Sequence, residues 1–158
     1  MSRVDGGLVR TPFIALVDRA NRALQVDMVR QAVDDGYDEI RPAHNLVFGT
    51  LYSEGSRASD MAARAGITKQ SMGEVVRDLV DLGILEMRPD PEDGRAKLVT
   101  YTEYGETVIG GGRRHLAELE DRFERAFGAD MYAAAREVLS RMAEVLAGET
   151  DGEQPVPQ

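Results

Sequence analysis

Residues 59–104 constrain the fold of this chain more than any other segment, because turn and capping residues divide them at fixed spacing. Gly66 suits a tight turn between two helices, since glycine adopts a positive φ at little cost. Thr68 is a good N-cap for a second helix, whose polar first turn would be residues 69–71. Apolar residues recur from there to Gly83, a natural C-cap. The segment therefore predicts two helices joined by a tight turn.

A β-hairpin is predicted to follow the second helix. Residues 89–97 contain two prolines, a glycine and several charged side chains, and apolar residues flank them on both sides. This pattern indicates a solvated loop between two short strands. Helix, turn, helix and hairpin in this order describe a winged helix-turn-helix, whose second helix enters the major groove of DNA.

At the hairpin the chain resembles the MarR (multiple antibiotic resistance regulator) family of bacterial transcription factors. The residues that carry the resemblance are Asp93, Gly94, Arg95, Leu98, Thr102 and Gly105. They follow the family pattern Asp-x-Arg, strand, Leu-Thr-x-x-Gly, except that Tyr101 stands where leucine is usual. The resemblance is clearest over residues 42–127. It implies a homodimeric, mainly α-helical regulator with a small β-hairpin, a repressor rather than an activator.

Composition agrees with such a protein. A chain of 158 residues fits one domain, or one DNA-binding lobe plus helices that complete a dimer. It has no cysteine, which excludes disulfides, thiolate metal ligands and peroxide sensing by a thiol. The sequence has no apolar run long enough for a membrane span and no signal-peptide pattern, so we expect a cytoplasmic protein.

The net charge of −9 is unusual for a protein that binds DNA, which should offer cations to phosphates. Most of the excess acid lies in residues 101–158, which carry a net charge of −6, whereas residues 57–100 carry −1. The cations that could share one face are Arg57, Lys69, Arg77, Arg88, Arg95 and Lys97. The acidic balance favours an alternative, a winged-helix protein-interaction module without sequence-specific DNA binding.

The apolar spacing divides the chain further. We expect a flexible arm (1–11), an N-terminal dimerisation helix (12–41), the winged helix-turn-helix lobe (42–104), C-terminal dimerisation helices (105–147) and a disordered acidic tail (148–158). A helix is predicted after Pro42, ending at Gly55. The seams of the C-terminal helices need apolar partners, which a second copy of the chain would supply.

Three consecutive glycines, Gly110, Gly111 and Gly112, interrupt the pattern after the hairpin. Each would cost a helix about 1 kcal/mol relative to alanine. They indicate either a loop before the helix begins, or close helix packing, or a hinge between the DNA-binding lobe and the dimerisation helices.

The predicted DNA-binding residues come from the second helix, the wing and one preceding arginine. They are Arg57, Thr68, Lys69, Gln70, Ser71, Glu74, Arg77, Arg88, Asp93, Arg95 and Lys97. Glutamine can pair with adenine and lysine can contact guanine or phosphate, while Glu74 would accept from cytosine or form a structural salt bridge. The resemblance implies that Arg95 enters the minor groove. Asp93 would hold Arg95 or the wing backbone.

Neither catalysis nor a metal site is predicted. His44 and His115 lack a ligand partner at metal-binding spacing, and the chain has no Ser-His-Asp order or phosphate-binding loop, so no cofactor is expected. The resemblance implies that a small effector, where one exists, binds between the dimerisation helices and the winged lobe. Residues that could line such a site are Phe13, Val17, His44, Phe48 and Ile109. The alternative is that they are ordinary core residues.

Overall fold

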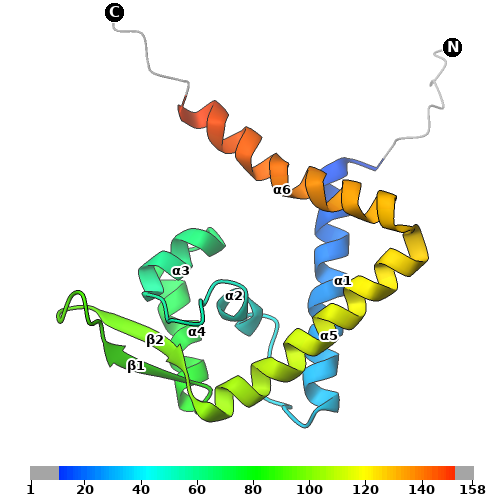
Figure 1. The fold of residues 1–158 in the computed structure, drawn as a ribbon. Coiled ribbons are helices and arrows are strands. Elements are labelled where there is room, and N and C mark those ends of the chain that lie inside the picture. The colour runs from blue at the N-terminus through cyan, green and yellow to red at the C-terminus, as the bar shows by residue number, and fades with distance from the viewer. Residues whose placement is uncertain (1–10, 152–158) are drawn as a thin grey trace, which may run out of the picture. The chain divides into compact units, whose positions relative to one another are not determined.

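The structure is a computed structural model that describes residues 11–151, with side chains described as far as residue 146. Residues 1–10 of the predicted arm and 152–158 of the predicted tail lie outside the described part. The described residues form six helices and one antiparallel pair of strands, which confirms the predicted fold class (Figure 1). In chain order they are α1 (Phe13–Asp34), α2 (His44–Phe48), α3 (Ala58–Ala65), α4 (Lys69–Asp81), β1 (Leu85–Pro89), β2 (Lys97–Tyr101), α5 (Glu103–Phe127) and α6 (Ala129–Asp151).

The chain divides into two compact units, Met1–His115 and Leu116–Gln158. The first unit contains α1 to α4, the hairpin and the first half of α5. The second contains the end of α5 and α6, which reverses direction after Gly128, a residue with a φ of 84°. In that unit Phe123 and Tyr132 place their rings 6.2 Å apart, and Arg136 donates to Glu120 at 2.8 Å. The functional division into a DNA-binding lobe and dimerisation helices stays a prediction.

The helix-turn-helix forms for the predicted local reasons. Gly66 has a φ of 66°, in the left-handed region that favours glycine. Thr68 caps α4, since its Oγ1 accepts from the backbone N–H of Ser71 at 3.1 Å. The turn and the cap confirm the sequence prediction and fix where α4 begins.

The hairpin joins the same core. Leu85 pairs with Tyr101 at its base, and Val99 exchanges two backbone hydrogen bonds with Ser56, at 2.9 and 3.1 Å. Gly105 lies so close to the residue before β1 that a Cβ there would be 2.0 Å from the carbonyl oxygen of Ile84. Large side chains from α3, α4 and the hairpin fill the core, among them Met61, Met72, Leu79, Leu85 and Val99.

The prediction that the helix after Pro42 continues to Gly55 is wrong. α2 ends at Phe48, and a turn follows at Gly49 and Thr50. The Oγ1 of Thr50 donates to the carbonyl of Leu46 at 2.5 Å. The backbone carbonyl of Thr50 accepts two hydrogen bonds from the guanidinium of Arg64, at 2.7 and 3.1 Å. Arg64 belongs to α3, so this stop signal comes from tertiary structure.

The glycine triplet lies inside α5, so the predicted loop before the helix is wrong. A Cβ at Gly111 would lie 2.9 Å from Oδ2 of Asp35, which agrees with the close-packing alternative. At Gly110 a Cβ would meet nothing within 4 Å, and at Gly112 it would make only an ordinary contact with Met28. Packing therefore explains one glycine of the three, and the hinge stays a prediction for the other two.

The predicted disordered tail begins too early. α6 continues to Asp151, so residues 148–151 are helical. A single Gly148 costs about 1 kcal/mol, which is too little to end a long helix.

Candidate nucleic-acid interface

Helix α4 has two different faces. Met72, Val76 and Leu79 are buried in the lobe core. The exposed side chains of α4 and its cap include Thr68, Lys69, Gln70, Ser71, Glu74 and Arg77. All six are predicted DNA-binding residues, and the structure brings them together on one helix with the polar side outward. This separation results from the spacing of the apolar residues, which repeat with the period of a helix.

The exposed face of α4 offers donors of two kinds. Gln70 donates its amide to Glu74 at 3.2 Å, a weak exposed bond that a base edge could replace. Lys69 and Arg77 make no side-chain hydrogen bond or ion pair with other described residues. The face therefore combines an amide that can recognise a base with cations that can meet phosphates.

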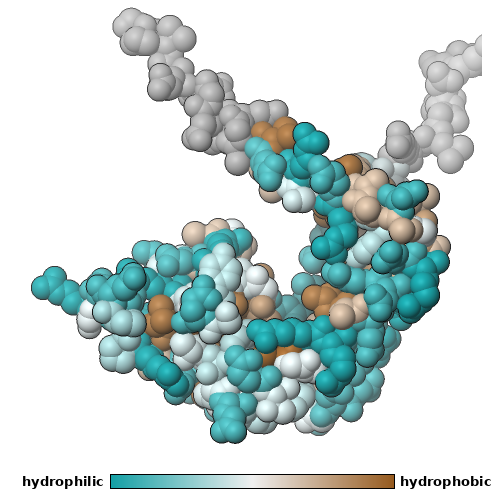
Figure 2. All heavy atoms as spheres, viewed as in Figure 1, coloured by the Kyte–Doolittle hydropathy of each residue, from teal (hydrophilic) through white to brown (hydrophobic). Residues whose placement is uncertain are grey.

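The wing places two further cations in solvent. Arg95 and Lys97 are exposed, and within residues 11–146 their side chains have no polar partner. The backbone N–H of Arg95 donates to Oδ1 of Asp93 at 3.1 Å. Asp93 thus holds the wing backbone, one of its two predicted roles. Figure 2 colours the tip of the wing as hydrophilic, in keeping with a solvated hairpin end.

Arg57 has a different environment from the other predicted cations. Its Nε donates to Oδ2 of Asp90 at 2.7 Å, and its second contact with the same oxygen is 2.6 Å long. The terminal nitrogen of this second contact lies 3.9 Å from Oδ2 of Asp93. These ion pairs raise the pKa of Arg57, with the hydrogen bond to Asp90 as the main cause. Arg57 is therefore an anchor of the wing, and the geometry gives it less freedom to contact DNA.

Asp90 is the site residue that the sequence prediction missed. It is buried at the base of the wing, and its Oδ1 accepts from the backbone N–H of Glu92 at 2.9 Å. That bond, followed by the one from Arg57, lowers the pKa of the carboxyl. The Asp-Pro dipeptide at this position is a turn signal that could have identified the residue.

Arg88 is also less available than predicted. Its guanidinium forms an ion pair with Glu86, two positions earlier on β1. Both side chains are exposed, so the pair is weak and competes poorly with a phosphate. Arg88 remains a candidate phosphate contact.

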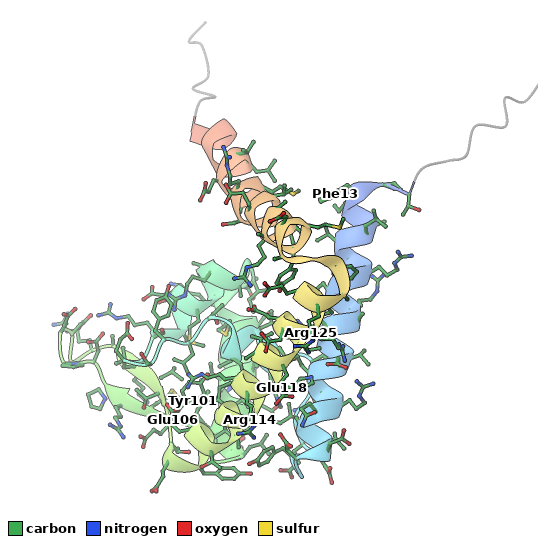
Figure 3. The ribbon with its side chains drawn as sticks, turned by 45° about the vertical axis from the view of Figure 1, so that its right-hand side comes forward. Phe13, Tyr101, Glu106, Arg114, Glu118 and Arg125 are labelled. Carbon is green, nitrogen blue, oxygen red and sulfur yellow. The ribbon has the colours of Figure 1, made fainter. Side chains whose placement is uncertain are left out.

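The five predicted ligand residues divide into two groups within the first unit. Ile109 is buried in the core, and Phe48 is partly buried and packs against that core. His44 is also buried, and its ring lies 6.5 Å from that of Phe48. Phe13 and Val17 are exposed on α1, Phe13 in its first turn (Figure 3). A cavity of about 220 Å³ lies elsewhere, with Tyr37 and Tyr104 in its wall, and none of the five lines it. Their role in ligand binding stays a prediction.

Tyr101, the departure from the family pattern, has an unusual hydroxyl. The side chain is 9% exposed, and its Oη has no hydrogen-bond partner among the described residues. It lies where β2 meets α5, near Glu106 (Figure 3). Burial raises the pKa of Tyr101 to about 12.

Two features are absent from the part of the chain that the structure describes. No group of three or more His, Asp or Glu side chains in that part of the chain is arranged to hold a metal ion. No helix there is both long and apolar enough to cross a membrane.

Comparisons with known proteins agree on one family. Residues 40–96 match the family model described as MarR family. An uncharacterized HTH-type transcriptional regulator of Mycobacterium bovis is 31% identical over 103 residues, which are 65% of this chain and 69% of that protein. An uncharacterized protein of the same organism is 31% identical over 88 residues, and the chain spans 62% of its length.

Solved structures match nearly the whole chain. The PcaV transcriptional regulator of Streptomyces coelicolor, in complex with its natural ligand, is 25% identical with a TM-score of 0.65. The match covers 91% of this chain and 98% of that one. CouR of Rhodococcus jostii, bound to p-coumaroyl-CoA, is 20% identical with a TM-score of 0.71, covering 87% and 96%. At this identity the second match concerns the fold alone.

Proposed function

Because this chain belongs to the MarR family of transcription regulators, we propose that it binds a near-palindromic DNA operator as a homodimer and represses the genes beside it. Members of this family are transcription regulators and not enzymes. A regulator of this kind acts where chromosomal DNA is accessible, so the cytoplasm is the proposed location.

The observation that carries the proposal is the exposed polar face of α4. A helix that buries Met72, Val76 and Leu79 on one side is held rigidly by the lobe, and its other side is free to enter a groove. Gln70, at the exposed N-terminal turn, is the residue we assign to base reading, and Lys69 and Arg77 are assigned to phosphates. Arg95 of the wing would enter the adjacent minor groove, whose negative potential favours a guanidinium.

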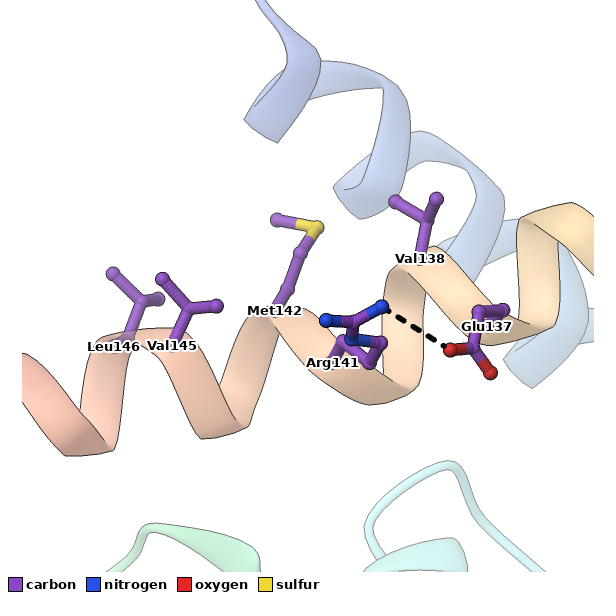
Figure 4. A pocket seen from close by; sticks show the side chains of 6 residues that line it. All are labelled: Glu137, Val138, Arg141, Met142, Val145 and Leu146. Atoms are coloured by element: carbon purple, nitrogen blue, oxygen red, sulfur yellow. Dashed lines mark ion pairs between the residues drawn. The ribbon is translucent and has the colours of Figure 1, made fainter.

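The proposed homodimer would bury apolar side chains that a single chain leaves exposed. On α1 these include Phe13, Ile14, Leu16 and Val17. In the second unit, α6 carries an apolar groove lined chiefly by Val138, Met142, Val145 and Leu146, with the Arg141–Glu137 ion pair beside it (Figure 4). Such faces in water are costly, and a second copy of the chain offers matching ones. Hydrophobic colours also lie along α6 in Figure 2.

A small-molecule effector is the finer part of the proposal. PcaV was solved with its natural ligand and CouR with p-coumaroyl-CoA, so proteins of this fold bind ligands. In this chain Phe13, Val17, Phe48 and Ile109 are proposed to contact an effector. The effector would change the separation of the two α4 helices and weaken binding, because both half-sites could no longer be engaged together.

The net charge of −9 favours a second candidate function, a protein-interaction module that uses the winged fold without reading DNA. The two candidates differ in salt dependence and in sequence preference. A DNA-binding dimer should select one consensus from random duplexes, with two inverted half-sites about 10 base pairs apart centre to centre. Its affinity should fall steeply with salt.

The experiment is a selection from random duplexes with the purified chain, followed by titration of the selected and a scrambled duplex at several salt concentrations. Preference for the selected duplex by about a thousandfold or more supports the regulator. Equal, weak binding of both duplexes would move the assignment to the protein-interaction module.

A further inference from the structure

The short helix α2 uses two consecutive side chains to hold two different helices. His44 is 1% exposed, and both of its ring nitrogens are occupied. The backbone N–H of Arg41 donates to Nδ1 at 3.1 Å, and Nε2 lies 2.7 Å from Oδ2 of Asp78 on α4. Because Nδ1 accepts a hydrogen bond, the ring proton of neutral His44 lies on Nε2, which donates to the carboxylate.

Asp78 is clamped from two sides near the C-terminal end of α4. Besides the bond from His44, it accepts from the guanidinium of Arg41. The hydrogen bond from His44 is the main cause that lowers the pKa of Asp78. An ionised carboxylate with two donors from residues 41–44 resists rotation of α4 about its axis, and such charge-assisted bonds are the stronger kind.

The next residue of α2 points elsewhere. Asn45 donates its side-chain amide to Oε1 of Gln25 on α1. Consecutive side chains of a helix point about 100° apart, so α2 can contact both neighbours at once. Phe48, one turn later, places its ring 6.5 Å from that of His44 in a T-shaped arrangement. A side chain of α1, the proposed dimer helix, is thereby connected through α2 to α4.

We propose that His44 is a positioning residue for DNA recognition: it orients α4 through Asp78, and α2 couples that orientation to α1 through Asn45. The inference rests on the proposed function, in which α4 reads bases. The sequence predicted His44 as a ligand-contacting residue. Because both of its ring nitrogens already have partners within the chain, we assign it this positioning role instead. Base contacts require geometry accurate to about 0.5 Å, whereas phosphate contacts tolerate more displacement. Loosening α4 should therefore reduce operator binding more than non-specific binding.

The test compares two substitutions of one residue. In His44→Gln, the glutamine amide keeps an N–H near the position of Nε2 and can still donate to Asp78. Leu in His44→Leu has a similar volume and no donor. We expect His44→Leu to lose operator affinity about tenfold with non-specific affinity unchanged, and His44→Gln to recover most of it.

A matched control separates orientation from folding. Arg64 also bridges segments of the lobe, donating to Thr50 and Ser56, but it makes no hydrogen bond or ion pair with α4 among the described residues. Arg64→Met should lower the melting temperature and reduce both affinities equally. Should His44→Leu fold poorly, Asp78→Asn serves instead, because it alters a partly exposed group and keeps an acceptor. Asp78→Asn should lower the ratio of operator affinity to non-specific affinity, by a smaller factor than His44→Leu.

A second readout needs no DNA. Amide hydrogen exchange should quicken in α4 more than in the other helices of the lobe in His44→Leu and, to a lesser degree, in Asn45→Leu, whereas Arg64→Met should quicken α4 no more than those helices. Unchanged α4 protection, or equal loss of operator and non-specific binding in His44→Leu, would overturn the positioning role. A wild-type chain without operator preference would instead refute the proposed function. The hydrogen-exchange comparison would still test whether His44 and Asn45 hold α4 in place.

Discussion

Arg57 and Asp90 join the start of α3 to the base of the wing, through an Nε–Oδ2 hydrogen bond of 2.7 Å. The carboxylate is 7% exposed, and its second oxygen accepts from the backbone of Glu92. One buried side chain thus holds both the turn of the wing and the arginine that anchors it. Leu85 and Val99 hold the strands of the hairpin in the core, and this ion pair adds a polar anchor where the turn of the wing begins.

The pair makes a prediction for acid stability. The pKa of Asp90 in the folded chain lies below its ordinary value of 3.8, so the stabilisation is present above that value and is lost as the pH falls through the folded pKa. Asp90→Asn should lower the melting temperature at neutral pH and flatten its fall below pH 4. Calorimetry across this range measures both effects. Asp38→Asn, which changes an exposed carboxylate, is the control, and an Asp90→Asn curve parallel to wild type would contradict the ion-pair role.

A second prediction distinguishes base recognition from phosphate contact. Gln70→Ala should cost about 1–3 kcal/mol on the selected operator and relax preference at one base position. Lys97→Ala should weaken binding to all sequences similarly, because a phosphate contact carries no sequence information. Repeating the selection with each variant measures the difference. An unchanged consensus for Gln70→Ala would remove that residue from base reading.

The hydroxyl of Tyr101 makes a third prediction. An unpaired buried hydroxyl costs about 1–3 kcal/mol, so Tyr101→Phe should stabilise the chain by an amount of that order. The folded pKa is raised from 10.0 to about 12, so the neutral form is favoured in the fold. This contribution is complete below pH 10 and is lost as the pH rises towards 12; Tyr101→Phe should lack this alkaline loss.

Denaturant unfolding from neutral to alkaline pH tests the third prediction. Tyr104→Phe is the control, because Tyr104 is half exposed and its hydroxyl can reach water. We expect its effect to stay within about 0.5 kcal/mol. Destabilisation by Tyr101→Phe would mean that the hydroxyl makes a bond in the native protein.

A fourth prediction concerns the dimer. Val138 and Val145 are 51% and 58% exposed in one chain, so glutamate at either position should leave the monomer folded. In a dimer that buries α6, the same charge should cost several kcal/mol and dissociate the complex at micromolar concentration. Ser140→Glu adds an equal charge to the same helix on a different face. Sedimentation that finds Val138→Glu and Ser140→Glu equally dimeric would exclude this face from the interface.

Local chemistry explains what the sequence predicted correctly. Gly66, Thr68 and Gly83 act within a few residues of themselves, so the turn, the cap and the start of the hairpin could be placed without tertiary information. The apolar spacing of α4 likewise separated its buried face from the face assigned to DNA.

Most of the failures involve partners far along the chain. α2 ends early because Arg64, in α3, binds the carbonyl of Thr50. The glycine triplet stays helical, and at Gly111 the close neighbour is Asp35, from the end of α1. His44 finds Asp78 across 34 positions and Arg57 finds Asp90 across 33. No local pattern encodes such pairs, which is why two predicted site residues proved to have structural partners.

The last prediction tests the wing. Arg95 is exposed near the hairpin tip, and Asp93 holds its backbone rather than its guanidinium. Arg95→Ala should therefore reduce operator affinity and lower the salt slope by about one unit per lost contact, because charge and groove fit are both removed. The melting temperature should stay nearly unchanged, since the side chain packs against little. Asp93→Ala should do less damage in the same direction, by loosening the backbone that presents Arg95.

The measurement is operator affinity against salt for wild type and both variants. Arg22→Ala removes an equal charge from an exposed ion pair on α1 and controls for the net charge of the protein. If only the total charge mattered, Arg22→Ala and Arg95→Ala would weaken binding equally. Full affinity and an unaltered salt slope in Arg95→Ala would mean that the wing does not touch DNA. That result would remove Arg95 from the DNA-binding residues and leave the exposed face of α4 as the part of the lobe assigned to the duplex, because an arginine that contacts phosphates or the minor groove must contribute to the salt slope.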